Sequence, residues 1–368
     1  MKQDLALRVL GEVMAWAEDR AREEFAWLLL MARLKYDGYN DYRAGARFIE
    51  SLADWLQQFD RSERESAYEF IRHNLVYIDP AQMRHLVELV YPEIVQRGLA
   101  ALVAIRLGIP AYRIWASSGA ERAYRVALRK MLFMALSDGA RIDLFRRVNV
   151  GIISNEQVVA SSETADDRWQ SLLEDLRKDL QDSTARFSSL FLLDDFIATG
   201  TTLLRWDEES GQWKGKLGRL WHHIQKVIET HLEDDWTLHV HHYIATQRAK
   251  DTVSERQLQA HAASGSGSWF DNIVFSYGIV LPSSFPIDRI RFGPFMQLID
   301  KYYDTAIETS HTSLGGTDVR LGFGGSAIPL VLEHNTPNNA VALLWAETEG
   351  IGGQHAMRPL FRRRQRHI

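Results

Sequence analysis

Hydrophobic residues recur at helical spacing along the first third of the chain. Apolar positions are separated by charged ones over residues 5–16 and again over residues 42–55, a pattern typical of helices with one buried face. A further helix is predicted from Pro80 to about residue 107, where Gly108 ends it. We therefore predict an all-helical region over residues 1–135.

A different pattern, in which short apolar runs are separated by charged helical segments, begins near residue 145. Runs of this length are typical of buried parallel strands, and there are four of them, at residues 148–154, 189–193, 236–244 and 272–281. Helices are predicted between them, at about residues 164–180 and 216–232. Such alternation predicts an α/β fold, with a parallel sheet flanked by helices. We place this domain at residues 136–310.

The last part of the chain, residues 311–368, is rich in Gly and Asn and contains one predicted strand, at residues 328–332. A polar turn follows over residues 333–339. We interpret this part as a C-terminal extension packed on the α/β core.

Composition restricts the possible functions. The chain has no cysteine, which excludes disulfides, thiolate metal sites and cysteine nucleophiles. Its formal net charge of -5 argues against a dedicated nucleic-acid-binding protein, although the Arg-rich tail at residues 362–367 could still bind nucleic acid or simply be solvated. The N-terminal residues are charged too often for a signal peptide. We expect a soluble cytoplasmic protein without membrane contact.

The segment Phe191–Thr202 carries the candidate chemistry. An apolar strand ends in Asp194 and Asp195, and an apolar pair then leads into the loop at residues 198–202, Ala-Thr-Gly-Thr-Thr. Parallel sheets bind ligands at the carboxyl ends of their strands. A glycine-containing turn offers backbone N–H groups to a phosphate, and the two acids can accept hydrogen bonds from ribose hydroxyls. The structural alternative is an ordinary strand-to-helix connection with a capped helix.

This segment resembles the signature of the phosphoribosyltransferase family: an apolar strand, an acidic pair, two apolar residues and a small Thr/Gly loop. The resemblance implies a parallel sheet of phosphoribosyltransferase type that binds phosphoribosyl pyrophosphate or a related nucleotide. It implies that Asp194 and Asp195 contact the ribose hydroxyls, with a magnesium ion near them that accompanies the pyrophosphate. The 5-phosphate would be bound by Ala198, Thr199, Gly200, Thr201 and Thr202.

A looser resemblance covers residues 136–147, 153–157 and 334–345. These segments are similar to bacterial phosphoribosyltransferase-like proteins with a C-terminal extension, which occur in conflict and anti-phage systems such as some retrons. The resemblance implies a role in antiviral defence.

A pyrophosphate-binding loop should follow the first strand of the core. By our strand prediction that place belongs to Ser154, Asn155, Glu156 and Gln157. Glu156 would repel a pyrophosphate unless a cation pairs with it. Arg141 is a candidate for that role, and a surface position is the alternative for it.

The family pattern is interrupted after the loop by an insertion at residues 207–216. Lys214 and Lys216 could reach a pyrophosphate as part of a lid, or the insertion could be a turn in solvent. In the C-terminal extension, three asparagines could likewise cover the sugar or base, or could form a turn; they are Asn335, Asn338 and Asn339.

Histidines and tryptophans are also concentrated in the α/β region. On the predicted third strand His239 and His241 share one face and His242 the other, and no carboxylate stands at ligand spacing, so we do not predict a metal site there. Four tryptophans are expected to pack in the core, with base stacking by one of them as the alternative; they are Trp206, Trp213, Trp221 and Trp236.

Two functions remain. The first is an enzyme that displaces pyrophosphate from C1 of phosphoribosyl pyrophosphate, although no catalytic residue can be assigned, because Ala198 stands where some purine-type relatives carry an acid. The second is a non-catalytic module that senses a nucleotide or phosphoribosyl ligand and contacts a protein partner through the helical region.

Overall fold

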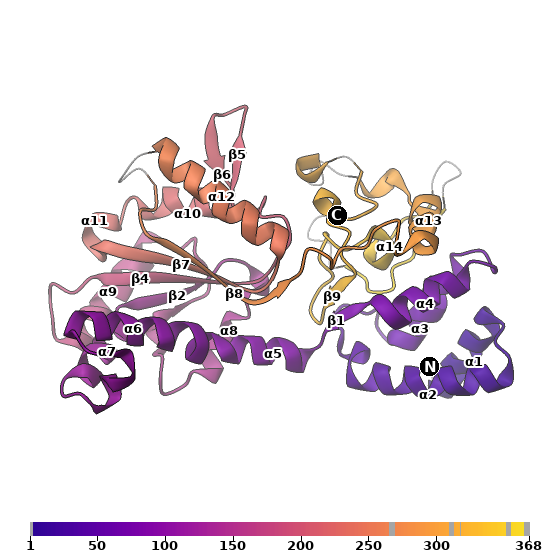
Figure 1. Cartoon of the computed structure of the whole chain (residues 1–368), viewed down its shortest axis with the longest axis horizontal. Coiled ribbons are helices and arrows are strands. Elements are labelled where there is room, and N and C mark those ends of the chain that lie inside the picture. The colour runs from indigo at the N-terminus through magenta and orange to yellow at the C-terminus, as the bar shows by residue number, and fades with distance from the viewer. Residues whose placement is uncertain (1–2, 265–268, 309–312, 317, 351–354, 364–368) are drawn as a thin grey trace. The chain divides into compact units, whose positions relative to one another are not determined.

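The computed structural model describes residues 3–264, 269–308, 313–316, 318–350 and 355–363. The chain forms two compact units (Figure 1). Unit 1 consists of Met1–Met83 together with Ser283–Ile368, and unit 2 consists of Arg84–Pro282.

Unit 2 is built around a five-stranded sheet in which every neighbouring pair of strands is parallel. The order across the sheet is β3-β2-β4-β7-β8. Of the strands in this sheet, β2 comes first in the sequence, and it lies between β3 and β4. The direction of winding therefore reverses between β2 and β4. The strands are β2 (Met131–Ala135), β3 (Val158–Val159), β4 (Phe187–Ile197), β7 (Leu232–Thr246) and β8 (Ile273–Leu281). The predicted parallel α/β fold is confirmed.

Helices cover both faces of this sheet (Figure 1). On one face, buried residues of α9, α10 and α12 form a hydrophobic core with alternate residues of β2, β4 and β7, such as Met134, Leu192 and Val240. On the other face, Phe145 of α8 contacts Phe133 of β2, with ring centroids 5.0 Å apart. The helices of this unit are α5 (Pro80–Leu89, which begins in unit 1), α6 (Gln96–Leu107), α7 (Ala120–Arg129), α8 (Ile142–Val148), α9 (Asp166–Leu180), α10 (Lys216–Ile224), α11 (Ile228–His231) and α12 (Gln247–Ser264).

The predicted strand at residues 148–154 is wrong. Helix α8 ends at Val148, and the side chains of Val150 and Ile152 are exposed rather than buried in a sheet. The first strand is instead β2, which lies inside the region predicted to be all-helical, 1–135. All five residues of β2 are buried, so the strand shows no alternation, and a short apolar run cannot be distinguished from a buried helical segment by periodicity.

The other predicted strands of the sheet are confirmed: residues 189–193 and 236–244 lie in β4 and β7, and β8 begins one residue after the start of the predicted strand 272–281. The insertion that follows the loop after β4 forms a two-stranded antiparallel hairpin, made of β5 (Arg205–Asp207) and β6 (Gln212–Lys214).

Unit 1 combines the two ends of the sequence. Strand β1 (Val76–Ile78) pairs in parallel with β9 (Leu330–Leu332), which confirms a strand in the C-terminal part and shows that residues 1–135 are not entirely helical. The indole of Trp55 donates a hydrogen bond of 2.6 Å to the carbonyl oxygen of Leu343. The C-terminal extension thus packs with the N-terminal helices. The helices are α1 (Gln3–Met14), α2 (Glu18–Leu34), α3 (Phe48–Gln57), α4 (Arg64–Asn74), α13 (Gly293–Tyr302) and α14 (Ala342–Trp345).

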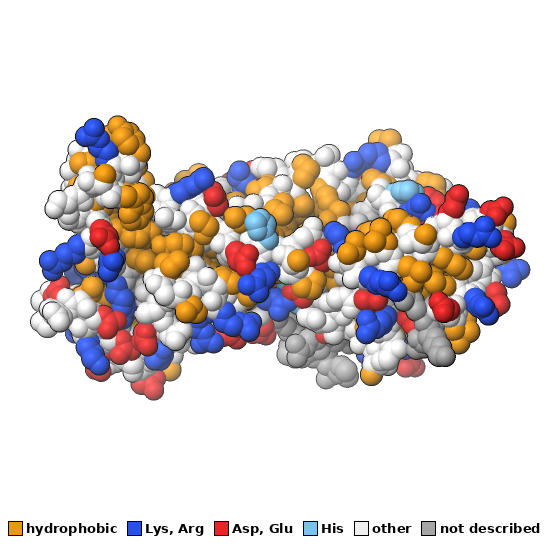
Figure 2. Space-filling view, turned by 90° about the horizontal axis from the view of Figure 1, so that it is seen from below, with side chains coloured by type: hydrophobic (Ala, Val, Ile, Leu, Met, Phe, Trp, Pro, Cys, Tyr) orange, Lys and Arg blue, Asp and Glu red, His pale blue; other side chains and the backbone are white. Residues whose placement is uncertain are grey.

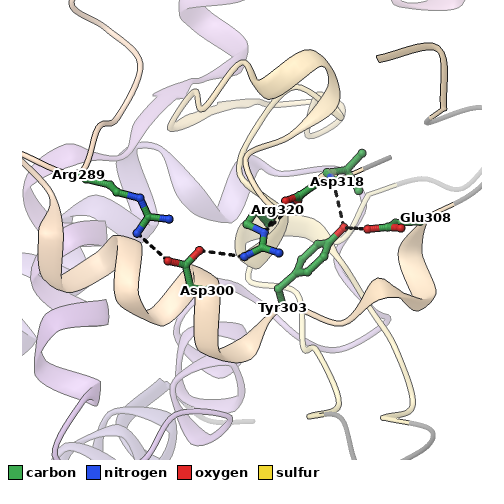
Figure 3. Close-up of polar contacts among 7 residues, drawn as sticks. Arg289, Asp300, Tyr303, Glu308, Asp318 and Arg320 are labelled. Carbon is green, nitrogen blue, oxygen red and sulfur yellow. Dashed lines mark hydrogen bonds and ion pairs between the residues drawn. The ribbon is translucent and has the colours of Figure 1, made fainter. Parts of the chain in front are cut away.

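A polar network fixes the segments around α13 (Figure 3). Asp300 accepts hydrogen bonds from Arg289, at 2.7 Å, and from Arg320, at 3.1 Å. The hydroxyl of Tyr303 donates to Glu308 at 2.6 Å and accepts from a backbone amide at 3.1 Å. One carboxylate therefore holds two arginines that lie far apart in the sequence.

None of the helices that the structure describes combines the length and the apolar composition needed to cross a bilayer.

Candidate functional site

The loop after β2 and the end of β4 lie side by side at the point where the winding of the sheet reverses. Ala135, the last residue of β2, is in register with Leu193, and the amide of Leu136 donates to the carbonyl oxygen of Leu193 at 2.9 Å. Residues 136–141 therefore begin beside Asp194. In open α/β sheets ligands bind in the crevice at this reversal, at the carboxyl ends of the strands.

Asp194 is buried, with 2% of its surface exposed. Its Oδ1 accepts a hydrogen bond from the hydroxyl of Ser137, and its Oδ2 lies 2.5 Å from Nζ of Lys216. Burial raises the pKa of Asp194, while the ammonium of Lys216 acts in the opposite direction. On the neighbouring strand, burial lowers the pKa of His242 to about 3, so that histidine is neutral and Lys216 is the cation that balances Asp194.

Asp195 points to the opposite face of the strand from Asp194, because successive side chains alternate. It is half-buried, and the loop after β2 approaches it closely: a Cβ added to Gly139 would lie 2.3 Å from Oδ2 of Asp195. Burial lowers the pKa of Arg141, and the nearby charge of Asp195 opposes this effect. The hydroxyl of Tyr243 donates to the carbonyl oxygen of Ala140 at 2.7 Å and holds the loop in place.

The loop at residues 198–202 bends sharply at Gly200, whose φ of 76° lies in the left-handed region that favours glycine. A Cβ added there would lie 2.8 Å from a methyl group of Val253 in α12. The start of the loop is anchored by Thr246, whose hydroxyl donates to the carbonyl oxygen of Ala198 at 2.6 Å. Glycine is therefore required by the backbone conformation and by the close approach of α12.

Several amides of this loop have no acceptor. Among the residues that the structure describes, none accepts a hydrogen bond from the backbone N–H of Thr199, Gly200 or Thr202. Thr199 and Gly200 are buried, and an unpaired buried N–H is costly unless a ligand or water satisfies it. Successive backbone N–H groups in a turn form a concave anion site. The loop and the two acids thus meet at one edge of the sheet, as the sequence predicts.

The residues predicted for the pyrophosphate loop are not all brought to this edge. Ser154–Gln157 precede β3, and the buried side chain of Gln157 donates to the carbonyl oxygen of Met131 at 3.0 Å, at the start of β2. Asp194 lies just beyond the other end of that strand. Of the predicted group only Arg141 lies by the acids. Sequence analysis missed Ser137 and Gly139, and the signal for them is the apolar run 131–136 followed directly by Ser-Asp-Gly.

The two lysines of the insertion have different partners. Lys214 pairs with Asp207 across the hairpin, at 3.0 Å, whereas Lys216 contacts Asp194. The hairpin is connected to α10 by Gly215, at which a Cβ would lie 2.5 Å from the carbonyl oxygen of Leu203. Of the two lysines, Lys216 contacts one of the acids, and a lid role for Lys214 stays a prediction.

The three asparagines predicted as a lid belong to unit 1, where they make local contacts. The amide group of Asn339 donates to the carbonyl oxygen of Phe323 at 3.0 Å, the carbonyl of Asn338 accepts from the amide of Phe323 at 2.7 Å, and the backbone amide of Asn335 donates to Leu332 at 3.1 Å. Their role as a lid stays a prediction.

The Arg-rich tail is described only in part. Arg362 pairs with Glu347 at 3.0 Å, and the guanidinium of Arg363 lies 5.5 Å from the ring centroid of Trp345. Residues 364–367 lie outside the described residues, and a nucleic-acid partner stays a prediction.

Few of the described side chains are placed to bind a metal ion. The structure, as far as it is described, contains no group of three or more His, Asp or Glu side chains that could hold a metal ion. Burial lowers the pKa of both His239 and His241 to about 4. Because no third such side chain among the described residues groups with Asp194 and Asp195 at this edge of the sheet, a magnesium ion would fit there only if oxygens of a bound phosphate and water completed its shell, the way Mg²⁺ is commonly held.

The family model PRTase-CE matches residues 52–363 of the chain. This span includes all of unit 2 and most of unit 1. No curated protein and no solved structure matches the chain.

Proposed function

The chain belongs to the PRTase-CE family, a family of phosphoribosyltransferase type, and on this premise we propose that unit 2 binds phosphoribosyl pyrophosphate or a related nucleotide. The observation that carries the proposal is the set of unpaired amides at Thr199, Gly200 and Thr202, next to Asp194 and Asp195. An anion is the ligand that satisfies such amides.

Each part of the ligand has a matching group at this edge. The 5-phosphate accepts hydrogen bonds from the amides of the loop at residues 198–202. Asp195 accepts from the ribose hydroxyls, because it is half-buried and can reach a ligand, whereas Asp194 is buried. The pyrophosphate lies along the loop that follows β2, near Arg141. A magnesium ion bound with the pyrophosphate would neutralise part of its charge.

In the catalytic form of the proposal, a nitrogen of an acceptor base forms a bond to C1 of the ribose. The bond between C1 and the pyrophosphate oxygen breaks, and the pyrophosphate leaves with the electron pair. The intervening state resembles an oxocarbenium ion, which negative charge near the ribose stabilises electrostatically. No residue of the chain is assigned to remove a proton from the acceptor.

A second candidate is a module that binds the same ligand without turnover. Two observations favour it. Ala198 provides no acid beside the ribose, and Lys216 holds Asp194 in a closed ion pair. In this form, binding changes the contacts of the loop, and a partner protein responds.

The test is calorimetric titration with phosphoribosyl pyrophosphate and Mg²⁺, together with an assay for released pyrophosphate in the presence of bases. Asp195→Asn is expected to abolish binding. The control is Asp234→Asn, whose side chain is 93% exposed in the same unit and which should bind as the native protein does. Pyrophosphate release favours the enzyme; binding without release favours the sensor. If the native protein does not bind the ligand, both are wrong.

We further propose a protein partner and a role in bacterial antiviral defence. Support for the defence role is the resemblance of residues 136–147, 153–157 and 334–345 to proteins of conflict systems. Support for the partner is a set of exposed apolar side chains on α6 and the 3₁₀ segment Ala111–Ala116: Ile105 is 79% exposed and Tyr112 is 81% exposed. In Figure 2, hydrophobic side chains gather toward the left, on the surface of unit 2. A plaque assay that compares cells carrying the native protein with cells carrying Asp195→Asn tests the defence role.

A further inference from the structure

The β5–β6 hairpin, α10, the end of α12 and Trp269 line an open pocket of about 350 Å³ in unit 2. Four of the residues that line it are tryptophans, Trp206, Trp213, Trp221 and Trp269. A volume of this size lies at the lower end of the range for small-molecule sites, roughly 300–1,000 Å³. None of its lining residues belongs to the two loops of the proposed phosphoribosyl site.

The pocket is a built feature of the fold. A Cβ added to Gly218 of α10 would lie 2.5 Å from the carbonyl oxygen of Trp213, so glycine is required for β6 to pack against this helix. Gly215, with φ of 112°, allows the sharp connection between the two. Trp206 and Trp213 are directly opposite each other in the hairpin ladder, with ring centroids 5.4 Å apart and planes at 64°. The hairpin is therefore held against α10.

The chemistry of the lining selects a flat, uncharged group. Among the residues that the structure describes, no Lys, Arg, Asp or Glu lines the pocket. Trp206 keeps 42% of its surface exposed, so part of this residue is accessible to a ligand. Gln212 and His222, both exposed, add an amide and an imidazole to the same pocket.

We propose that this pocket binds the base of a nucleoside or nucleotide. Nucleobases are recognised by stacking on aromatic side chains and by hydrogen bonds to their edges, and the pocket contains groups for both. A quaternary ammonium ion also binds to aromatic side chains, but it has no polar edge for Gln212 and His222 to contact. The base pocket is a second site, distinct from the one that binds the sugar phosphate.

The experiment uses the full chain labelled with 5-fluorotryptophan and observed by ¹⁹F NMR. Adenosine, guanosine, cytidine and uridine are titrated in turn, and the resonances of Trp206 and Trp213 are assigned from single Trp→Phe variants. Binding in the pocket moves these two resonances along a saturable curve. Trp206→Ala is expected to weaken binding about 5- to 150-fold, the effect typical of losing one stacking partner. The matched control is Trp115→Ala, which removes another exposed tryptophan of unit 2, at 56% exposure, and leaves binding unchanged.

Failure of this inference is distinguishable from failure of the proposed function. Asp195 is not among the residues that line the pocket, so Asp195→Asn leaves the nucleoside shifts of the Trp206 and Trp213 resonances intact; phosphoribosyl pyrophosphate carries no base, so Trp206→Ala leaves its binding intact. Gln212→Ala, on an exposed side chain, provides a second variant that should also weaken nucleoside binding. The inference is overturned if no nucleoside moves the two resonances, if Trp206→Ala binds as well as the native protein, or if only tetramethylammonium or only an oligonucleotide produces the shifts.

Discussion

Replacing Lys216 by methionine removes the cation next to Asp194 and keeps most of the aliphatic volume of the side chain. Asp194 is 2% exposed and the side chain of Lys216 is 23% exposed, so the aspartate cannot turn to water when its partner is lost. Among the described residues, only the hydroxyl of Ser137 then donates a hydrogen bond to this carboxylate, and the neutral His242 lies 3.8 Å from it.

The expected loss in the free energy of unfolding follows from the burial of Asp194. Removing one partner of a buried ion pair destabilises a protein by about 3–5 kcal/mol, because the remaining charge is left without compensation. Since the ammonium of Lys216 is partly in water and Ser137 stays bound, we expect the lower end, about 3 kcal/mol near neutral pH. Asp194→Asn in the same chain should restore about 2 kcal/mol of this, because the uncompensated charge is then absent.

The cost should also depend on pH. Burial raises the pKa of Asp194 above its usual 3.8, and losing Lys216 removes the main effect that opposes the rise. Between 3.8 and the raised value, the folded state binds more protons than the unfolded state, so the variant gains stability as the pH falls through this window. The deficit of Lys216→Met relative to the native protein should therefore be larger at about pH 7 than at about pH 5.

Urea unfolding of the native protein, both single variants and the double variant gives the four corners of a thermodynamic cycle. The reasoning is refuted if Lys216→Met costs less than about 0.5 kcal/mol at neutral pH, or if its deficit grows as the pH falls.

Three further outcomes are expected. Gly139→Ala should remove phosphoribosyl pyrophosphate binding in calorimetry, because its Cβ would lie 2.3 Å from a carboxylate oxygen of Asp195. The control is Gly98→Ala in α6, where the added Cβ would meet open space. This variant should keep binding and raise the free energy of unfolding by about 0.5–1 kcal/mol. Asp300→Asn should lower the free energy of unfolding by no more than about 1 kcal/mol in urea titration, as for partly exposed ion pairs. The hydrogen bond from Arg289 holds the pKa of Asp300 below its usual value, so the native protein should lose this contribution as the pH falls through the usual range of Asp, and the Asn variant should lack that component of acid sensitivity.

The strands of the sheet could be predicted from the sequence where turn residues flank them and where the neighbouring helices are rich in charged residues. Strands β4, β7 and β8 meet both conditions. Strand β2 does not, because it directly follows the amphipathic helix α7 and all of its residues are apolar, so nothing in the local pattern separates it from the helix. Residues 148–154 show the converse error, since Val150 and Ile152 are apolar but exposed.

The site was predictable within one segment and not beyond it. Phe191–Thr202 contains both the strand end and the loop, so their proximity follows from chain connectivity. The contribution of the loop after β2 depends on the register of β2 against β4, which is a tertiary property. Likewise, the contact of Lys216 with Asp194 requires the hairpin to fold back through Gly215, and spacing along the sequence does not determine that path.

The pairing of β1 with β9 has a consequence for synthesis on the ribosome. Val76 cannot pair with Leu330 until the ribosome has made Leu330. At about 5–20 residues per second, synthesis of the intervening chain takes on the order of 10–50 s. During that time unit 2 can complete its sheet, while the N-terminal helices lack the C-terminal residues that they pack against, such as Phe361 next to Phe48. Newly made chains are therefore expected to be most vulnerable to aggregation and proteolysis at their N-terminal end, and truncation before residue 330 should trap them in that state.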